Sequence, residues 1–102
     1  MEKFDYLIVG AGFSGCTIAE RLKSIGKKVI VVDKRTHIGG NSYDFFDSNG
    51  VLVHKFGPHY FRTDNQKVKD YLSKFTEWLP CEYRVRAFVN GKLFPLPINR
   101  DT

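Results

Sequence analysis

The run Asp5-Tyr6-Leu7-Ile8-Val9-Gly10-Ala11-Gly12-Phe13-Ser14-Gly15 joins a short apolar segment to a glycine-rich turn. Residues 5–9 do not alternate between apolar and polar side chains, which is typical of a strand buried on both faces. The six residues that follow have the spacing GxGxxG. The run therefore predicts a buried strand that ends in a tight turn.

A helix and a second strand are predicted after the turn. Ile18, Leu22 and Ile25 are spaced as one face of a helix, and Gly26 stands where such a helix would end. Residues 29–32, Val-Ile-Val-Val, are a second unbroken apolar run and predict another buried strand. Residues 1–41 thus predict a Rossmann-like βαβ unit, in which one helix connects two parallel strands.

The glycines of the turn suit the binding of a dinucleotide. Gly10 permits a sharp turn, Gly12 lets the backbone approach a pyrophosphate, and Gly15 lets the helix pack closely on the strand. The helix N-terminus offers free N–H groups and the positive end of its dipole to phosphate. Asp33 follows the second strand, where it can accept hydrogen bonds from a ribose diol. We predict dinucleotide binding, and a βαβ unit without a ligand is the alternative.

The residues after Asp33 bear on the choice between NAD and FAD. Residues 34–41, Lys-Arg-Thr-His-Ile-Gly-Gly-Asn, contain a second glycine pair. With the first turn, this block resembles the extended fingerprint of the FAD family that includes amine oxidases and glutathione-reductase-like enzymes. The resemblance implies that Gly39 and Gly40 pass close to the FAD ribose and phosphates, and it favours FAD over NAD.

Residues 42–102 predict two hairpins and a surface helix. Asn49-Gly50 and Asn90-Gly91 each stand between apolar runs, which indicates hairpin turns with positive φ at both central residues. Thr63 or Asp64 is the expected cap of the helix. Its apolar stripe comprises Val68, Tyr71, Leu72 and Phe75. The prolines of the segment 95–98 are expected to end regular strand pairing.

Two further groups of residues are candidates for a site. Gly57-Pro58 forces a turn that presents His59 and Tyr60 from a loop. His59 is either structural or part of a site, and a structural role is expected for the other two histidines. Arg84 and Arg86 share one face of a predicted strand, which is either solvated or a wall facing an anionic ligand.

The composition is that of a folded globular chain of 102 residues, with 42% hydrophobic and 26% charged side chains. The net charge of +5 is scattered, which argues against nucleic acid as a partner and favours an anionic small molecule. The apolar runs are too short to span a membrane, and no leader precedes the first strand, so we expect a cytoplasmic protein without a membrane partner. Cys16 and Cys81 have no metal-ligand spacing, so we expect reduced thiols and no metal site.

Four blocks of the sequence together resemble UDP-galactopyranose mutase. These blocks are residues 10–15, 35–41, 54–61 and 90–99. The last two blocks are more particular to that family than the first two. The resemblance spans essentially the whole chain and implies an isomerase that interconverts UDP-galactopyranose and UDP-galactofuranose. It implies that the flavin acts in its reduced form, with N5 attacking the anomeric carbon of UDP-galactose and expelling UDP.

The same resemblance implies roles for individual residues. Those implied to hold the FAD diphosphate are Gly10, Gly12, Phe13, Ser14 and Gly15. Those implied to bind the rest of the cofactor are Asp33 and Lys34 at the adenosine end, Gly40, Asn41, and His59 with Tyr60 against the isoalloxazine. His59 is the implied catalytic residue. Tyr83 and Arg84 fall where family members often have an asparagine near the substrate, and they are the candidate substrate-binding residues.

Members of that family are several times longer than this chain, so we expect residues 1–102 to be the N-terminal part of an FAD-binding domain. That part comprises the βαβ unit 1–41 and the hairpins and helix of 42–102, an α/β fold that is incomplete without further parallel strands. It should not catalyse alone, and the full-length enzyme is expected to be a homodimer. The alternatives are an amine-oxidase-like FAD oxidoreductase and a stand-alone nucleotide-binding module.

Overall fold

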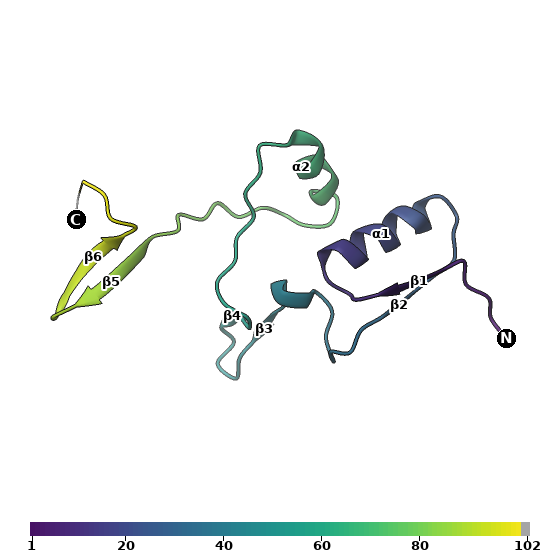
Figure 1. The fold of residues 1–102 in the computed structure, drawn as a ribbon, viewed down its shortest axis with the longest axis horizontal. Coiled ribbons are helices and arrows are strands. Elements are labelled where there is room, and N and C mark those ends of the chain that lie inside the picture. The colour runs from purple at the N-terminus through teal and green to yellow at the C-terminus, as the bar shows by residue number, and fades with distance from the viewer. Residues whose placement is uncertain (101–102) are drawn as a thin grey trace. The chain divides into compact units, whose positions relative to one another are not determined.

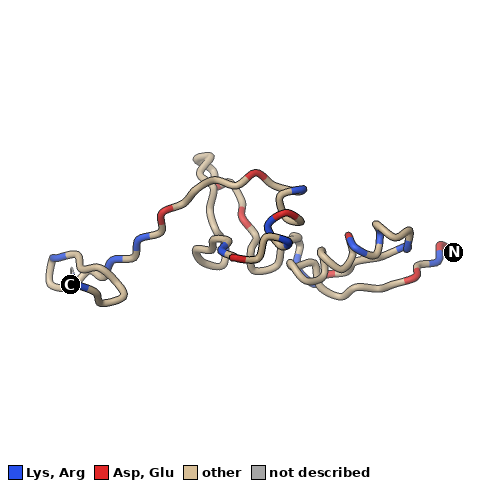
Figure 2. Tube along the Cα trace, turned by 90° about the horizontal axis from the view of Figure 1, so that it is seen from above, with Lys and Arg blue, Asp and Glu red and all other residues tan. Residues whose placement is uncertain are grey.

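The computed structural model describes residues 1–100 (Figure 1). The chain divides into two compact units, residues 1–59 and the described residues from Tyr60 onward. The βαβ unit and the first hairpin belong to the first unit, and the second helix and second hairpin belong to the second. Basic and acidic residues are interspersed along the described chain up to Glu82, and the charged residues from Arg84 to Arg100 are all basic (Figure 2). Among the described residues, no helix combines the length and apolar character needed to cross a membrane.

The predicted βαβ unit is present at the start of the first unit. It consists of β1 (Tyr6–Val9), α1 (Phe13–Ser24) and β2 (Val29–Val32). The two strands are parallel, with Tyr6 opposite Val29 and Val9 opposite Val32, and α1 packs against both (Figure 1). Gly26 follows the helix with φ of 82°, a conformation that favours glycine and ends the helix as predicted.

The expected burial of these strands on both faces is wrong for the described residues. Leu7 is 64% exposed and Val9 is 79% exposed. Ala11 is the one buried hydrophobic residue in the described part of the chain, at 4% exposure. The reason is that α1 covers one face of a sheet that has two strands among residues 1–100.

The first hairpin follows a short 3₁₀ helix (Gly40–Ser42) and pairs β3 (Asp44–Phe46) with β4 (Leu52–His54). Its turn differs from the predicted one, because Gly50 has positive φ (77°) and Asn49 does not. The N–H of Asp47 donates to the carbonyl of Val51 at 2.9 Å, which closes a three-residue loop. The Asp47 carboxylate stabilises this loop by accepting the N–H groups of Asn49 and Val51 at 2.8 and 2.9 Å.

This longer loop changes the pairing of the hairpin by one residue. A two-residue turn at 49–50 would place Lys55 opposite Asp44. The observed register instead places His54 opposite Asp44. The two side chains consequently lie on the same face of the hairpin.

In the second unit, α2 (Gln66–Leu72) begins one or two residues later than predicted. Asn65 is its cap, and its side-chain oxygen accepts the N–H groups of Lys67 and Val68 at 3.0 and 3.3 Å. Thr63, an expected cap, accepts the N–H of Asn65 instead, at 3.1 Å. Phe75 lies beyond the end of α2, so the predicted apolar stripe is shorter than expected.

The second hairpin pairs β5 (Val85–Val89) with β6 (Lys92–Leu96). Its turn is the predicted one, because Asn90 and Gly91 have φ of 48° and 76° and Val89 lies opposite Lys92. Pro95 was expected to end the pairing, but it lies within β6 opposite Arg86. A two-stranded ribbon tolerates proline because each strand has an edge that needs no N–H donor.

Candidate functional site

The glycine turn between β1 and α1 has the geometry that its spacing predicts. Gly10 has φ of 106°, and its N–H donates to the carbonyl of Val32 at 2.7 Å, which joins the turn to the end of β2. A Cβ placed on Gly15 would lie 1.9 Å from the carbonyl oxygen of Gly10 and 3.3 Å from Cγ2 of Ile8. Only glycine therefore permits the observed approach of α1 to β1.

The structure brings the second glycine pair against this turn. The N–H of Gly39 donates to the carbonyl of Ala11 at 2.8 Å, and a Cβ on Gly40 would lie 3.1 Å from Cα of Gly12. A Cβ on Gly12 would meet nothing closer than Cα of Gly40 at 3.9 Å, so the space beside Gly12 is open. Gly12 is the N-cap of α1 and supplies no side-chain hydrogen bond, which leaves the N–H groups of the first turn, including those of Phe13 and Ser14, available to an anion. This open cradle fits a dinucleotide diphosphate.

Asp33 connects the turn to the end of β2. Its Oδ2 accepts the N–H of Ala11 at 2.7 Å, and its Oδ1 accepts the N–H of Arg35 at 2.8 Å. The hydrogen bond from Ala11, followed by that from Arg35, lowers the pKa of Asp33 below its ordinary value. Each carboxylate oxygen retains a second lone pair, so a ribose hydroxyl can still bind. The sequence indicated the ribose role but not this structural one.

Residues 34–41 hold their own conformation through an arginine that sequence analysis did not single out. Both terminal nitrogens of Arg35 lie 3.0 Å from Oδ1 of Asn41, and the guanidinium stacks over the ring of Phe56 at 4.5 Å. Asn41, a predicted cofactor contact, is thereby fixed beside the glycine pair. Lys34 follows Asp33 directly at the end of β2. The ring of His37 stacks on Tyr43 at 3.9 Å, in agreement with the structural role expected for it.

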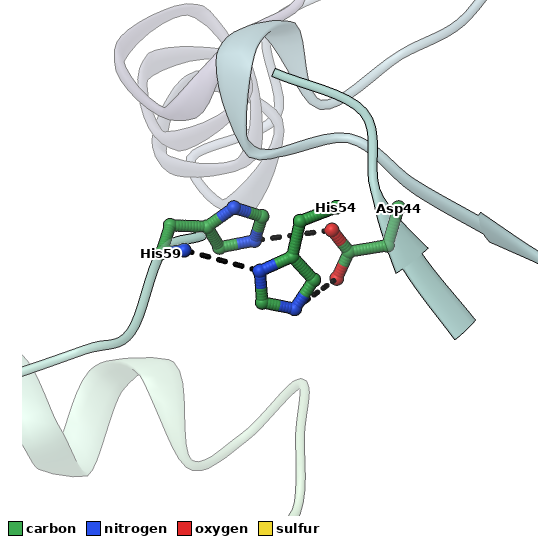
Figure 3. Close-up of side chains that lie close together, drawn as sticks. All are labelled: Asp44, His54 and His59. Atoms are coloured by element: carbon green, nitrogen blue, oxygen red, sulfur yellow. Dashed lines mark hydrogen bonds and ion pairs between the residues drawn. The ribbon is translucent and has the colours of Figure 1, made fainter. Parts of the chain in front are cut away.

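Asp44, His54 and His59 form a cluster within the first unit (Figure 3). His59 Nε2 lies 3.2 Å from Asp44 Oδ1, and His54 Nε2 lies 3.9 Å from Asp44 Oδ2. The two imidazole rings stack with their centroids 4.0 Å apart. Of these three residues, the sequence pattern indicates His59 alone as a site residue, and the register that places His54 opposite Asp44 is the signal for the other two.

This cluster has the composition of a metal site, because two histidines and a carboxylate are common ligands of transition metals. One hydrogen bond argues against the binding of a metal by these three side chains. The backbone N–H of His59 donates to His54 Nδ1 at 3.0 Å, so neutral His54 carries its proton on Nε2. A protonated Nε2 has no lone pair to offer a metal that sits beside Asp44.

The predicted substrate residues lie in the second unit. Tyr83 and Arg84 line a hollow of about 600 Å³ at the base of the second hairpin. Its other lining residues are Val85, Arg86, Pro95, Leu96 and Asn99. Arg84 and Arg86, which were predicted to share one face of a strand, thus line the same hollow. Arg84 also forms an ion pair with Glu82 at 3.1 Å. The ring of Tyr60 lies against that of Tyr83 at 5.2 Å.

The fold and the turn together define a dinucleotide-binding protein. Residues 8–75 match the family model described as an NAD(P)-binding Rossmann-like domain, and the chain belongs to that family. The α/β Rossmann-like prediction is thereby confirmed.

Particular relatives give a narrower comparison. The chain is 50% identical over its full length to a probable UDP-galactopyranose mutase of Klebsiella pneumoniae. It is 44% identical over 94% of its length to a dTDP-fucopyranose mutase of Escherichia coli. An FAD-dependent oxidoreductase of Monascus ruber is 31% identical over 79% of the chain. These matches confirm the resemblance to UDP-galactopyranose mutase, and the chain spans about a quarter of the length of the two mutases (27% and 26%).

Proposed function

We propose that this chain is the dinucleotide-binding part of a flavin-dependent UDP-galactopyranose mutase, which interconverts UDP-galactopyranose and UDP-galactofuranose. The observation that carries the proposal is the 50% identity, over the whole chain, to a relative named for that activity. The FAD-dependent oxidoreductase relatives match less of the chain, one at 31% identity over 79% of it and another at 46% identity over 69%. This difference favours a mutase over an oxidoreductase of the amine-oxidase-like class.

The residues of the first unit suit FAD as the cofactor. The uncapped start of α1 and the open space at Gly12 would hold the diphosphate, and Asp33 would bind the adenosine ribose. Gly40 and Asn41 would lie beside the cofactor, and His59 would contact the isoalloxazine. When bound in its reduced form, the flavin supplies the nucleophile that attacks the anomeric carbon of the sugar.

The proposal also covers the substrate, the oligomeric state and the cellular location of the full-length enzyme. The substrate is a UDP-galactose isomer, and the hollow lined by Tyr83 and Arg84 is the candidate contact for it. The full-length enzyme is proposed to be a cytoplasmic homodimer. The E. coli relative is named for a dTDP-linked fucose, so the nucleotide and the sugar are the specificities to test first.

The test uses the complete product of the coding region. It is incubated with UDP-galactofuranose, with and without dithionite, and UDP-galactopyranose is followed by chromatography. A parallel reaction contains dTDP-fucopyranose. Conversion of the UDP sugar that depends on the reductant supports the proposal. Conversion of the dTDP sugar alone overturns the substrate, and a flavin-loaded protein that converts neither sugar overturns the mutase activity.

A further inference from the structure

The hydrogen-bond directions in the cluster of Asp44, His54 and His59 determine where the protons of the two rings lie. The backbone N–H of His59 occupies His54 Nδ1, at 3.0 Å, so the proton of neutral His54 is on Nε2. That nitrogen faces Oδ2 of Asp44 (Figure 3). The backbone therefore fixes the tautomer of His54 without any contribution from Asp44.

The other carboxylate oxygen of Asp44 needs a donor. Oδ1 of Asp44 is buried and has no hydrogen-bond partner of standard geometry among the described residues. A buried acceptor without a donor is costly, and the nitrogen that faces it is Nε2 of His59, at 3.2 Å. The pair does not meet hydrogen-bond geometry, so it is the negative charge of the carboxylate, 3.2 Å away, that favours a proton on Nε2. The second ring nitrogen of His59, Nδ1, then lies 3.3 Å from the carbonyl oxygen of Gly57.

We propose that Asp44 is a positioning residue for His59, because its carboxylate holds the imidazole with a proton on Nε2 and leaves Nδ1 as the position that gains or loses a proton. A proton that arrives at Nδ1 finds the Gly57 carbonyl as its acceptor, so the ring needs no reorientation. The consequence for the flavin rests on the proposed function, in which His59 contacts the isoalloxazine. The orientation of the ring does not rest on it.

The chemical identity of Asp44 makes the proposal specific. A carboxylate offers acceptors on both sides and can face two N–H groups, one from each histidine ring. An asparagine offers one acceptor and one N–H₂ donor. Because the backbone fixes His54, the ring that must adapt in Asp44→Asn is that of His59, which should move its proton to Nδ1, facing Gly57.

The experiment reads the ring tautomers by heteronuclear NMR. The complete gene product is labelled at histidine and measured at a pH where both imidazoles are neutral, and the signals are assigned with His54→Gln and His59→Gln. The wild type should show both rings with the proton on Nε2. Asp44→Asn should shift His59 alone to the Nδ1–H tautomer. The matched control is Asp70→Asn, which makes the same chemical change on the exposed face of α2 and should shift neither ring.

A wild-type His59 with its proton on Nδ1 would overturn the proposal, even if the Asp44→Asn protein failed to fold. An unchanged His59 tautomer in folded Asp44→Asn would overturn it as well. In the mutase assay, Asp44→Asn should lower kcat by up to about 100-fold, because the His59 ring is misplaced, with a smaller change in KM. Should the wild-type protein show no mutase activity while the tautomers behave as described, the proposed function fails and the positioning role of Asp44 stands.

Discussion

Replacement of Gly15 by alanine tests the packing on which the cofactor site depends. The new Cβ would lie 1.9 Å from the carbonyl oxygen of Gly10, and the ordinary separation of such atoms is about 3.4 Å. The start of α1 must therefore move away from β1 by about 1.5 Å. Because the obstructing atom belongs to the backbone, no side-chain rotation relieves the contact.

Two measurable effects follow from this displacement. Overpacking of this kind costs about 1–3 kcal/mol of stability, and a backbone obstruction lies at the upper end of that range. The same movement takes the N–H groups of α1 out of hydrogen-bond range of a bound diphosphate. Each hydrogen bond to a charged group is worth about 1.5–3 kcal/mol, so the loss of two weakens FAD binding by about 3–6 kcal/mol. That corresponds to a dissociation constant raised by roughly two to four orders of magnitude.

The assay titrates the apoprotein of the complete gene product with FAD and follows the flavin fluorescence, together with thermal unfolding. Gly26→Ala is the matched control, because no atom lies within 4 Å of its Cβ. Its φ of 82° should cost about 1–2 kcal/mol of stability and leave the FAD affinity unchanged. Gly12→Ala should do the reverse, with apoprotein stability kept and FAD affinity lost. A Gly15→Ala protein with unchanged unfolding temperature and FAD affinity would show that the close approach of α1 to β1 at Gly15 is not needed for either.

Three further predictions concern the turn, the second helix and the flavin contact. The hydrogen bonds from Ala11 and Arg35 lower the pKa of Asp33 from 3.8, so their stabilisation is present above that pH and is lost as the pH falls through the folded-state pKa. Thermal unfolding between neutral and acidic pH should accordingly show a shallower acid decline in Asp33→Asn, and an identical decline would contradict this. Asn65→Ala removes the cap of α2 and should cost about 1 kcal/mol in denaturant unfolding, and no loss would show that the cap is dispensable. His59→Ala in the full-length enzyme should alter the flavin absorption spectrum and lower kcat by about 100-fold, and a neutral result would return His59 to a structural role.

The parts of the fold that sequence analysis predicted correctly are those controlled by local interactions. The spacing of Gly10 and Gly15 is sufficient because the turn and the start of α1 are adjacent in the chain. The ending of α1 at Gly26 and the turn at Asn90-Gly91 depend on the φ of one or two residues. These features require no knowledge of what packs against them.

The two Asn-Gly dipeptides show that a turn cannot always be predicted from its two central residues alone. Asn49-Gly50 has the same residues as Asn90-Gly91 but forms a longer loop, because the Asp47 carboxylate accepts two backbone N–H groups across it. That single difference moves His54 opposite Asp44 and assembles the cluster with His59. The cluster can be predicted only if the register of the hairpin is known without an error of even one residue. A shift of one residue moves each side chain of a strand to the opposite face.

The burial of β1 and β2 was mispredicted for a different reason. An apolar strand sequence indicates that both faces of the strand can be buried, but other elements of the fold must do the burying. Among the described residues, α1 packs against both strands and still leaves side chains such as Leu7 and Val9 exposed. The sequence of a strand therefore indicates burial without indicating which element supplies it.

We infer that the turn at residues 10–15 holds the diphosphate of FAD. The most direct measurement is the cofactor content of the complete gene product, with titration of its apoprotein by FAD and by NAD(P)H in parallel. We expect a yellow protein that contains stoichiometric FAD and whose apoprotein binds FAD but neither nicotinamide dinucleotide. Tight binding of a nicotinamide dinucleotide, with no affinity for FAD, would contradict it.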